Sequence, residues 1–132
     1  MAARLKSFSY AFNGIKTLIH GEHNAWLHLA STLVIITMAF ALKITASDWR
    51  WIILSIALVW FAEAFNTAIE RLCNVVSRDF HEGIKASKDL AAGAVLICAI
   101  FAAVIGIVTL TPYLISPNEV PAFFDDICRT FL

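Results

Sequence analysis

Three long runs of apolar residues, at 26–42, 51–69 and 90–110, dominate the chain. Each run is close to the ~20 residues that a helix needs to cross the hydrocarbon core of a bilayer. Lipid offers the backbone no hydrogen-bond partners, so spanning segments of this length are expected to be helical. The pattern predicts an all-α integral membrane protein with three transmembrane helices.

The segment before the first run, from residue 4 to residue 20, has a different pattern. Its apolar residues recur every three or four positions: Leu5, Phe8, Phe12, Ile15 and Ile19. That spacing places them on one face of a helix, and Arg4, Lys6 and Lys16 add positive charge. We therefore expect an amphipathic helix on the membrane surface. A helix that packs on the rest of its own protein remains the alternative.

Composition agrees with a membrane location. The 132 residues are 60% hydrophobic and 15% charged, which is more apolar surface than a soluble domain of this size could bury. The formal net charge of zero gives no sign of a nucleic-acid partner. We expect residues 1–111 to form one membrane domain and assign no role to residues 112–132. Three prolines in the segment 111–121 predict that the third helix breaks there.

Basic residues predict how the chain is oriented. They gather in the N-terminal segment and in residues 71–89, whereas the C-terminal tail has Arg129 alone beside three acidic residues. Basic loops stay on the cytoplasmic side of a membrane. The N-terminus and the second loop should therefore be cytoplasmic, and the first loop and the tail outside. The predicted location is the cytoplasmic (inner) membrane, with several spans.

The second apolar run continues into a stretch that carries carboxylates, AEAFNTAIERL, from Ala62 to Leu72. At 100° per residue, its polar side chains fall within an arc of roughly 100°. They are Glu63, Asn66, Thr67, Glu70 and, just beyond, Asn74. Two carboxylates with an amide between them can bind a hard cation such as Mg²⁺. The alternative is that the two glutamates only pair with lysines of neighbouring helices.

Further polar residues fall on the same side of the membrane. Glu22 precedes the first run, and Lys88 and Asp89 directly precede the third. Acidic groups for a metal and lysines for phosphate indicate a nucleotide site at the interface. Neither a phosphate-binding glycine loop nor a protein-kinase motif is present in the sequence. A non-enzymatic scaffold and a small transporter remain open, although a transporter would need polar groups near the midplane of several spans.

Zinc binding is not predicted. His20, His23 and His28 are spaced by three and five residues, so they do not share one helix face. The three cysteines have no metal-type spacing and are expected to be small packed residues.

The stretches AEAFNTAIERL, DFHEGIKASKDLAAGAVL and GEHNAWLHL closely resemble the prokaryotic diacylglycerol kinase family, which includes the undecaprenol kinases. The resemblance covers roughly residues 8–106. It implies a homotrimer of three-helix subunits, each with an N-terminal surface helix. It also implies transfer of the γ-phosphate of ATP to a lipid hydroxyl, with Mg²⁺. The small residues 91–94 would allow the close helix approach that such a trimer needs.

The same resemblance implies roles for individual residues. Glu63 matches the general base, Glu22 and Glu70 match the metal-binding glutamates, and Asn66 matches a supporting asparagine. The positions that match nucleotide contacts are Tyr10, Glu22, Glu70, Asp79, Phe80, His81, Lys88 and Asp89.

The chain also departs from the family pattern. Asn74 stands where the family often has aspartate, and Arg4 is one residue away from the position of the family's arginine. His28 stands where some diacylglycerol kinases carry a glutamate, and the undecaprenol kinases resemble this chain there. A histidine can be neutral near pH 7, which suits an extended polyprenyl chain beside it. His28 is therefore the candidate for lipid selectivity, with undecaprenol as the predicted acceptor and diacylglycerol as the alternative.

Overall fold

The computed structural model describes residues 2–115 except 22 and 78. This part of the chain is helical, with no strand in it. The helices are α1 (Ala2–Gly21), α2 (His23–Leu42), α3 (Ala46–Val76) and α4 (Glu82–Ile115). The last three contain the segments that are long and apolar enough to cross a membrane. The predicted all-helical class with three spans is therefore confirmed.

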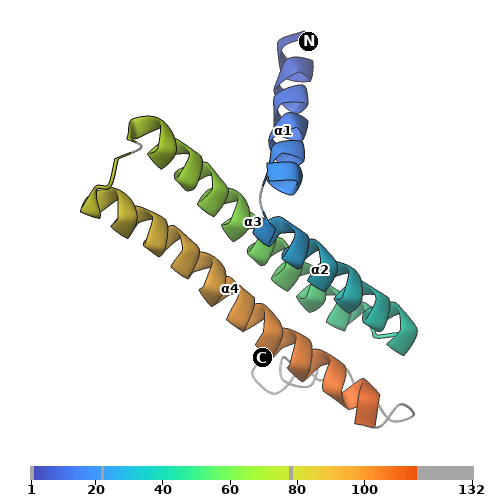
Figure 1. Cartoon of the computed structure of the whole chain (residues 1–132). Helices are drawn as coiled ribbons and strands as arrows, with labels where there is room; N and C mark the ends of the chain where they lie inside the picture. The colour runs from blue at the N-terminus through green and yellow to red at the C-terminus, as the bar shows by residue number, and fades with distance from the viewer. Residues whose placement is uncertain (1, 22, 78, 116–132) are drawn as a thin grey trace, which may run out of the picture.

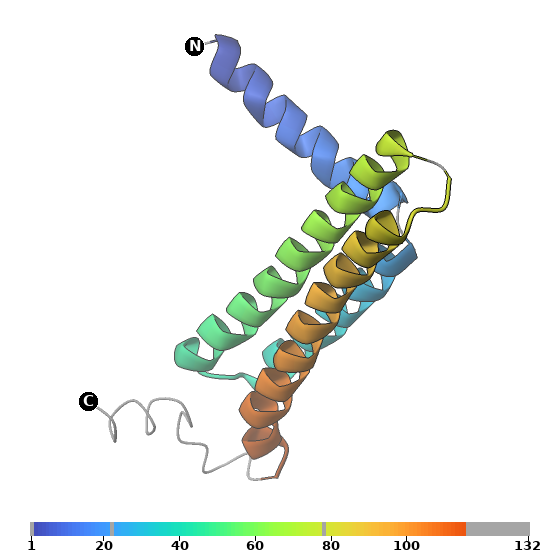
Figure 2. The ribbon, with the colours of Figure 1, turned by 90° about the vertical axis from the view of Figure 1, so that its left-hand side faces the viewer.

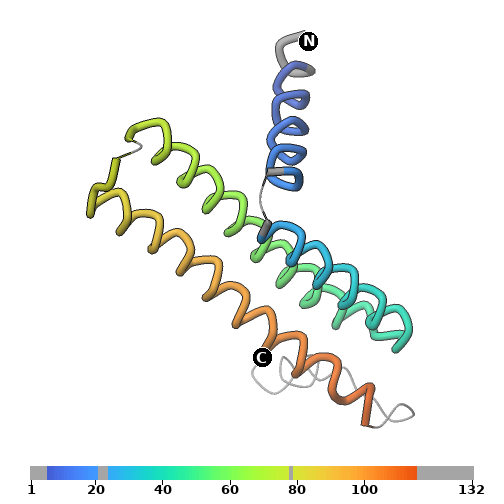
Figure 3. The backbone as a smooth tube through the Cα atoms, in the orientation of Figure 1, coloured from blue at the N-terminus to red at the C-terminus, as the bar shows by residue number. Residues whose placement is uncertain are grey.

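The three long helices lie side by side (Figures 1 and 3). α3 and α4 lie side by side along their whole length and form a hairpin. α2 covers only the half of this hairpin that lies nearest the α2–α3 loop. The half nearest the α3–α4 turn therefore projects beyond α2. α1 leaves the bundle steeply at the start of α2, as Figure 2 shows from the side. Phe8, Phe12 and Ile15 of α1 are exposed and Leu18 is buried, so the placement of α1 on a membrane surface stays a prediction.

Local capping explains why α3 starts earlier than the apolar run. Lys43 ends α2 with a φ of 52°, in the left-handed region, and the chain turns there. The Thr45 side chain then caps α3 by accepting a hydrogen bond from the Asp48 backbone N–H at 3.3 Å. The helix therefore begins at Ala46 and not at the predicted Trp51. α3 and α4 both extend past their apolar runs because their polar ends are helical as well.

The first of the three prolines expected to break the third helix, Pro112, does not end it. Pro112 lies inside α4, which continues to Ile115. Proline removes only one backbone donor, and a tertiary contact holds the turn that follows it. The Tyr113 hydroxyl donates a hydrogen bond to Asp48 Oδ2 and accepts one from the Thr45 backbone N–H at 3.0 Å. Tyr113 also belongs to the buried apolar cluster at this end of the bundle, with Ala39, Ile44, Ile52 and Leu110.

This contact predicts the effect of removing one hydroxyl. Tyr113→Phe leaves Asp48, which is 1% exposed, without the donor from α4. Losing a hydrogen bond to a buried charged group should lower the free energy of unfolding by about 1–3 kcal/mol. The measurement is unfolding in mild detergent, followed by circular dichroism. Tyr10→Phe, the same change at an exposed site, is the control. Equal unfolding midpoints for the two variants would contradict the structural role of Tyr113.

Candidate functional site

The polar face of α3 changes from buried to exposed along the helix. Glu63 is 1% exposed, and Asn66 and Thr67 are buried with it. Glu70 is half-buried, and Asn74 is exposed. The opposite face carries exposed apolar side chains such as Phe65 and Leu72, as the helical spacing predicts. The stripe therefore runs from a dry end at Glu63 to a wet end at Asn74.

The dry end of the stripe meets α2 through His28. The Nε2 atom of His28 lies 3.7 Å from Oε2 of Glu63, which is within ion-pair distance. The side chain of His28 is 18% exposed and that of Glu63 only 2%. Sequence reasoning selected both residues but for separate roles, and it did not predict that they touch. Thirty-five positions separate them in the sequence, and no helical period relates residues on two different helices.

Two oxygen donors lie one turn apart further along the stripe. The amide oxygen of Asn66 is buried and makes no hydrogen bond within the described part of the chain. Glu70 follows four residues later, on the same face. Mg²⁺ takes oxygen ligands and is usually held by one or two carboxylates, with phosphates and water completing its shell. These donors fit that ion. Glu22, the other predicted ligand, lies outside the described residues, and those residues contain no group of three or more metal-ligating side chains.

The wet end of the stripe opens on a concave surface formed by the α3–α4 hairpin. Five predicted nucleotide-binding residues line it: Asp79, Phe80, His81, Lys88 and Asp89. Lys88 Nζ donates a hydrogen bond to Asn74 Oδ1 at 2.7 Å, so Asn74 positions this lysine. The sequence placed Asn74 on the polar face, where the family often has a charge, but did not predict this contact. Asp89 forms an ion pair with Lys85 at 2.8 Å.

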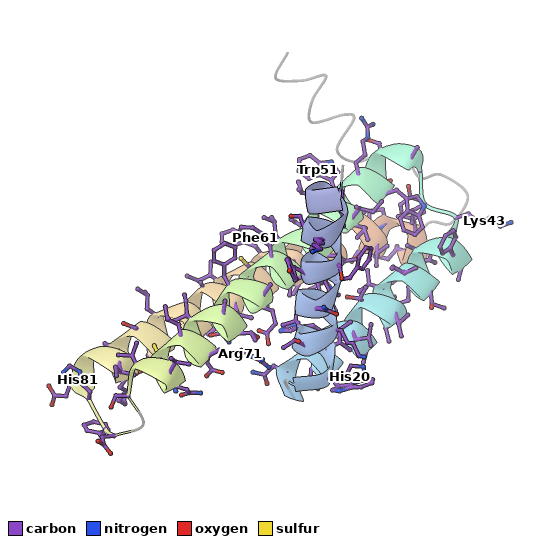
Figure 4. All side chains as sticks on the ribbon, turned by 90° about the horizontal axis from the view of Figure 1, so that it is seen from above. His20, Lys43, Trp51, Phe61, Arg71 and His81 are labelled. Atoms are coloured by element: carbon purple, nitrogen blue, oxygen red, sulfur yellow. The ribbon has the colours of Figure 1, made fainter. Side chains whose placement is uncertain are left out.

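Of the other three predicted nucleotide contacts, Glu70 does not line this surface and Glu22 lies outside the described residues. The third, Tyr10, is not brought to this surface either. It is 70% exposed on α1, and α1 packs against α2 and α3. In Figure 4, His20 marks the end of α1, while His81 and Lys43 mark opposite ends of the bundle. The hairpin surface therefore lies at the end of the bundle remote from the α2–α3 loop.

An apolar groove runs down from His28 between the three long helices. It has a volume of about 470 Å³ and is lined by residues of α2, α3 and α4, from His28 at one end to Leu114 at the other. The part of the α4 wall nearest the start of that helix carries small residues: Ala99, Ala102, Ala103 and Gly106. A Cβ atom added at Gly106 would meet no heavy atom within 4 Å, which shows how open the groove is there. Sequence reasoning missed the groove, although these small residues recur at helical spacing.

Comparison with known proteins identifies this arrangement. The profile described as "Prokaryotic diacylglycerol kinase" matches residues 9–110. The chain belongs to the prokaryotic diacylglycerol kinase family. An undecaprenol kinase of Bacillus subtilis is 33% identical over 109 residues, which cover 83% of this chain and 89% of that protein. A diacylglycerol kinase of Synechocystis sp. is 36% identical over 113 residues, which cover 85% of this chain and 65% of that protein.

Membership of the diacylglycerol kinase family makes the chain a lipid kinase and a multi-pass membrane protein. The scaffold and transporter alternatives are therefore set aside. A lipid kinase must bring together a phosphate donor dissolved in water and an acceptor dissolved in the membrane. The exposure gradient along α3 suits that requirement, because one continuous polar face joins a dry end to a wet end.

Proposed function

We propose that this lipid kinase transfers the γ-phosphate of ATP to the hydroxyl of undecaprenol, with Mg²⁺. The observation that carries the proposal is the continuous stripe on α3, which has the groove at its dry end and the hairpin surface at its wet end. An acceptor whose tail lies in the groove would present its hydroxyl beside Glu63. A nucleotide on the hairpin surface would approach the same stripe from water.

Phosphoryl transfer depends mainly on positioning and on neutralising charge, so each residue has a simple task. Glu63 accepts the proton of the acceptor hydroxyl as general base. Glu70 and Asn66, together with Glu22, would hold Mg²⁺, which offsets negative charge on the phosphates when bound. Lys88, held by Asn74, adds a positive charge at the hairpin surface. The predicted nucleotide contacts of Tyr10, Asp79, Phe80, His81 and Asp89 are part of the proposal.

The choice of undecaprenol rests on the shape of the groove. Its α4 wall runs from Ala99 to Leu114, which is about 22 Å along the helix axis. A groove of this length suits an extended tail, and a polyprenol has a single tail where diacylglycerol has two. His28 at the mouth would suit an apolar tail better than a glutamate would. Diacylglycerol remains the second candidate, because a relative of similar identity is named a diacylglycerol kinase.

Orientation and assembly complete the proposal. α1 and the α3–α4 turn lie toward one end of the bundle and the α2–α3 loop lies at the other (Figure 2). This arrangement supports a cytoplasmic N-terminus and hairpin in the inner membrane. The homotrimer that the family resemblance implies stays a prediction; Ala92 and Ala94 are exposed on α4, where a second subunit could approach closely.

The decisive assay combines purified protein in lipid nanodiscs with labelled ATP, Mg²⁺, and undecaprenol and diacylglycerol in competition. Wild-type protein should phosphorylate undecaprenol with the higher kcat/KM. Glu63→Gln should reduce transfer to either lipid by about 10²–10⁴-fold, because the general base is lost. Glu82→Gln, the same change at an exposed site in the first turn of α4, is the control. A wild-type rate in Glu63→Gln would refute the assignment of the base.

The metal assignment predicts a change in Mg²⁺ dependence. Glu70→Gln keeps the side-chain shape but removes a charged oxygen ligand. The Mg²⁺ concentration for half-maximal activity should rise about 10–100-fold, the loss typical of a disturbed metal site. Titrating activity with Mg²⁺ at saturating ATP measures this, with the unfolding midpoint as a check on folding. A titration that matches the wild-type curve would exclude Glu70 as a ligand.

The groove predicts how acceptor length matters. Gly106→Leu would fill the groove below His28 and exclude part of the tail. Losing the burial of two methylene groups, at about 0.8 kcal/mol each, should raise the KM for undecaprenol about tenfold. The KM for a short prenyl alcohol that ends above Gly106 should not change. Val104→Leu, on the exposed side of the same helix, is the control. Equal effects of Gly106→Leu on long and short acceptors would show that the tail lies elsewhere.

A further inference from the structure

Trp60 links α2 to α3 one turn before Glu63. Its indole Nε1–H donates a hydrogen bond to Thr32 Oγ1 at 3.0 Å. Its ring also meets the His28 imidazole edge-on, with ring centroids 6.4 Å apart and an interplanar angle of 64°. Thr32 and His28 are one turn apart on α2, as Trp60 and Glu63 are on α3. The four side chains therefore form a closed set of contacts between the two helices.

The proposed function does not explain how the buried Glu63 carboxylate loses the proton that it accepts. A general base must release the proton it accepts before the next turnover, yet the Glu63 side chain is only 2% exposed. Water reaches such a group poorly. The imidazole of His28 lies against Glu63 and is 18% exposed, so it connects the buried carboxylate to the interface. Neutral imidazole can take up one proton on one nitrogen and release another from the second.

Other ionisable side chains of the neighbouring helices are separated from Glu63 along a helix axis or face water. On α3, Glu70 lies two turns from Glu63, about 10 Å along the helix axis. Lys16 and His20, in the second half of α1, are exposed. In α4, from Leu90 to Ile115, the titratable side chains are Cys98 and Tyr113, and the tyrosine is bonded to Asp48 at the far end.

We propose that His28, held in place by Trp60 and Thr32, takes the acceptor's proton from Glu63 and passes it to water. The proposal rests on the role of Glu63 as base. The acceptor O–H bond breaks as its oxygen bonds to the γ-phosphorus, and the electron pair of the β–γ bridge leaves with ADP. The proton goes first to Glu63 and then to Nε2 of His28. A small side-chain rotation would shorten the 3.7 Å between His28 Nε2 and Glu63 Oε2 to hydrogen-bond distance. Trp60 is a positioning residue in this scheme.

Chemical rescue tests the relay directly. His28→Ala should lower kcat about 10²-fold, the contribution typical of a group that moves a proton in a reaction. Added imidazole should restore the rate in proportion to its concentration, and the KM for ATP should stay as in wild type. Trp26→Ala, an exposed aromatic residue of the same helix, should gain nothing from imidazole. A His28→Ala enzyme that imidazole does not restore, or that keeps the wild-type kcat, would overturn the relay.

A double-mutant cycle tests the positioning role. Trp60→Phe removes the indole donor and Thr32→Val removes its acceptor with little change of shape. Each should lower kcat about fivefold, as one hydrogen bond typically contributes, and the double variant should lose no more than either single variant. If the fold losses in kcat of the two single variants multiplied in the double variant, the role of Trp60 would be overturned. Wild-type rates in both single variants would overturn it as well. Glu63→Gln separates this proposal from the proposed function. Its strongly reduced rate should not respond to imidazole, and a wild-type rate would refute the base itself.

Discussion

The unbroken backbone of α3 is the constraint on which the site depends. Lipid cannot replace a lost backbone hydrogen bond, so a helix that crosses the membrane is strongly favoured to continue without a break. α3 has 31 residues and is about 46 Å long, enough to cross the bilayer and continue into water. Its rigidity sets the depth of every polar group on it. Glu63 and Glu70 are two turns apart in the folded protein, with Asn66 between them.

A polar face that crosses from lipid to water offers an alternative to the glycine-rich loops of soluble kinases. Those loops bind phosphates with backbone N–H groups, which a transmembrane helix uses in its own hydrogen bonds. In the proposed site, side chains do that work. The acidic and amide groups of α3 and the lysine held by Asn74 are arranged along one hairpin. The cost is the burial of the Glu63 carboxylate, which lies against His28 on α2.

Each end of the bundle is held by a different polar contact. At the α2–α3 loop, Tyr113 of α4 bonds to Asp48 and Thr45 at the start of α3. At the α3–α4 turn, Lys88 bonds to Asn74 across the hairpin. Between these ends, small residues of α4 leave the groove open beside α2. Anchors at both ends allow the middle of the bundle to remain loosely filled, which a binding site for a long apolar tail requires.

Two kinds of information could be derived from the sequence alone. The apolar runs predicted three spanning helices because the bilayer imposes a length and excludes charge. The period of the helix predicted that Glu63, Asn66 and Thr67 share one face, because neighbours on one helix are related by 100° per residue. Family resemblance then supplied roles for Glu63 and Asn66.

Contacts between helices were decided only by the tertiary structure. The pairs His28 with Glu63 and Asn74 with Lys88 each join two helices, and the period of one helix says nothing about its rotation against another. The passage of α4 through Pro112 depends on a partner of Tyr113 that lies 65 positions earlier in the chain. The groove likewise exists because three helices pack at a distance set by all their side chains together. Local pattern therefore determined which groups face the same way, and packing determined which of them meet.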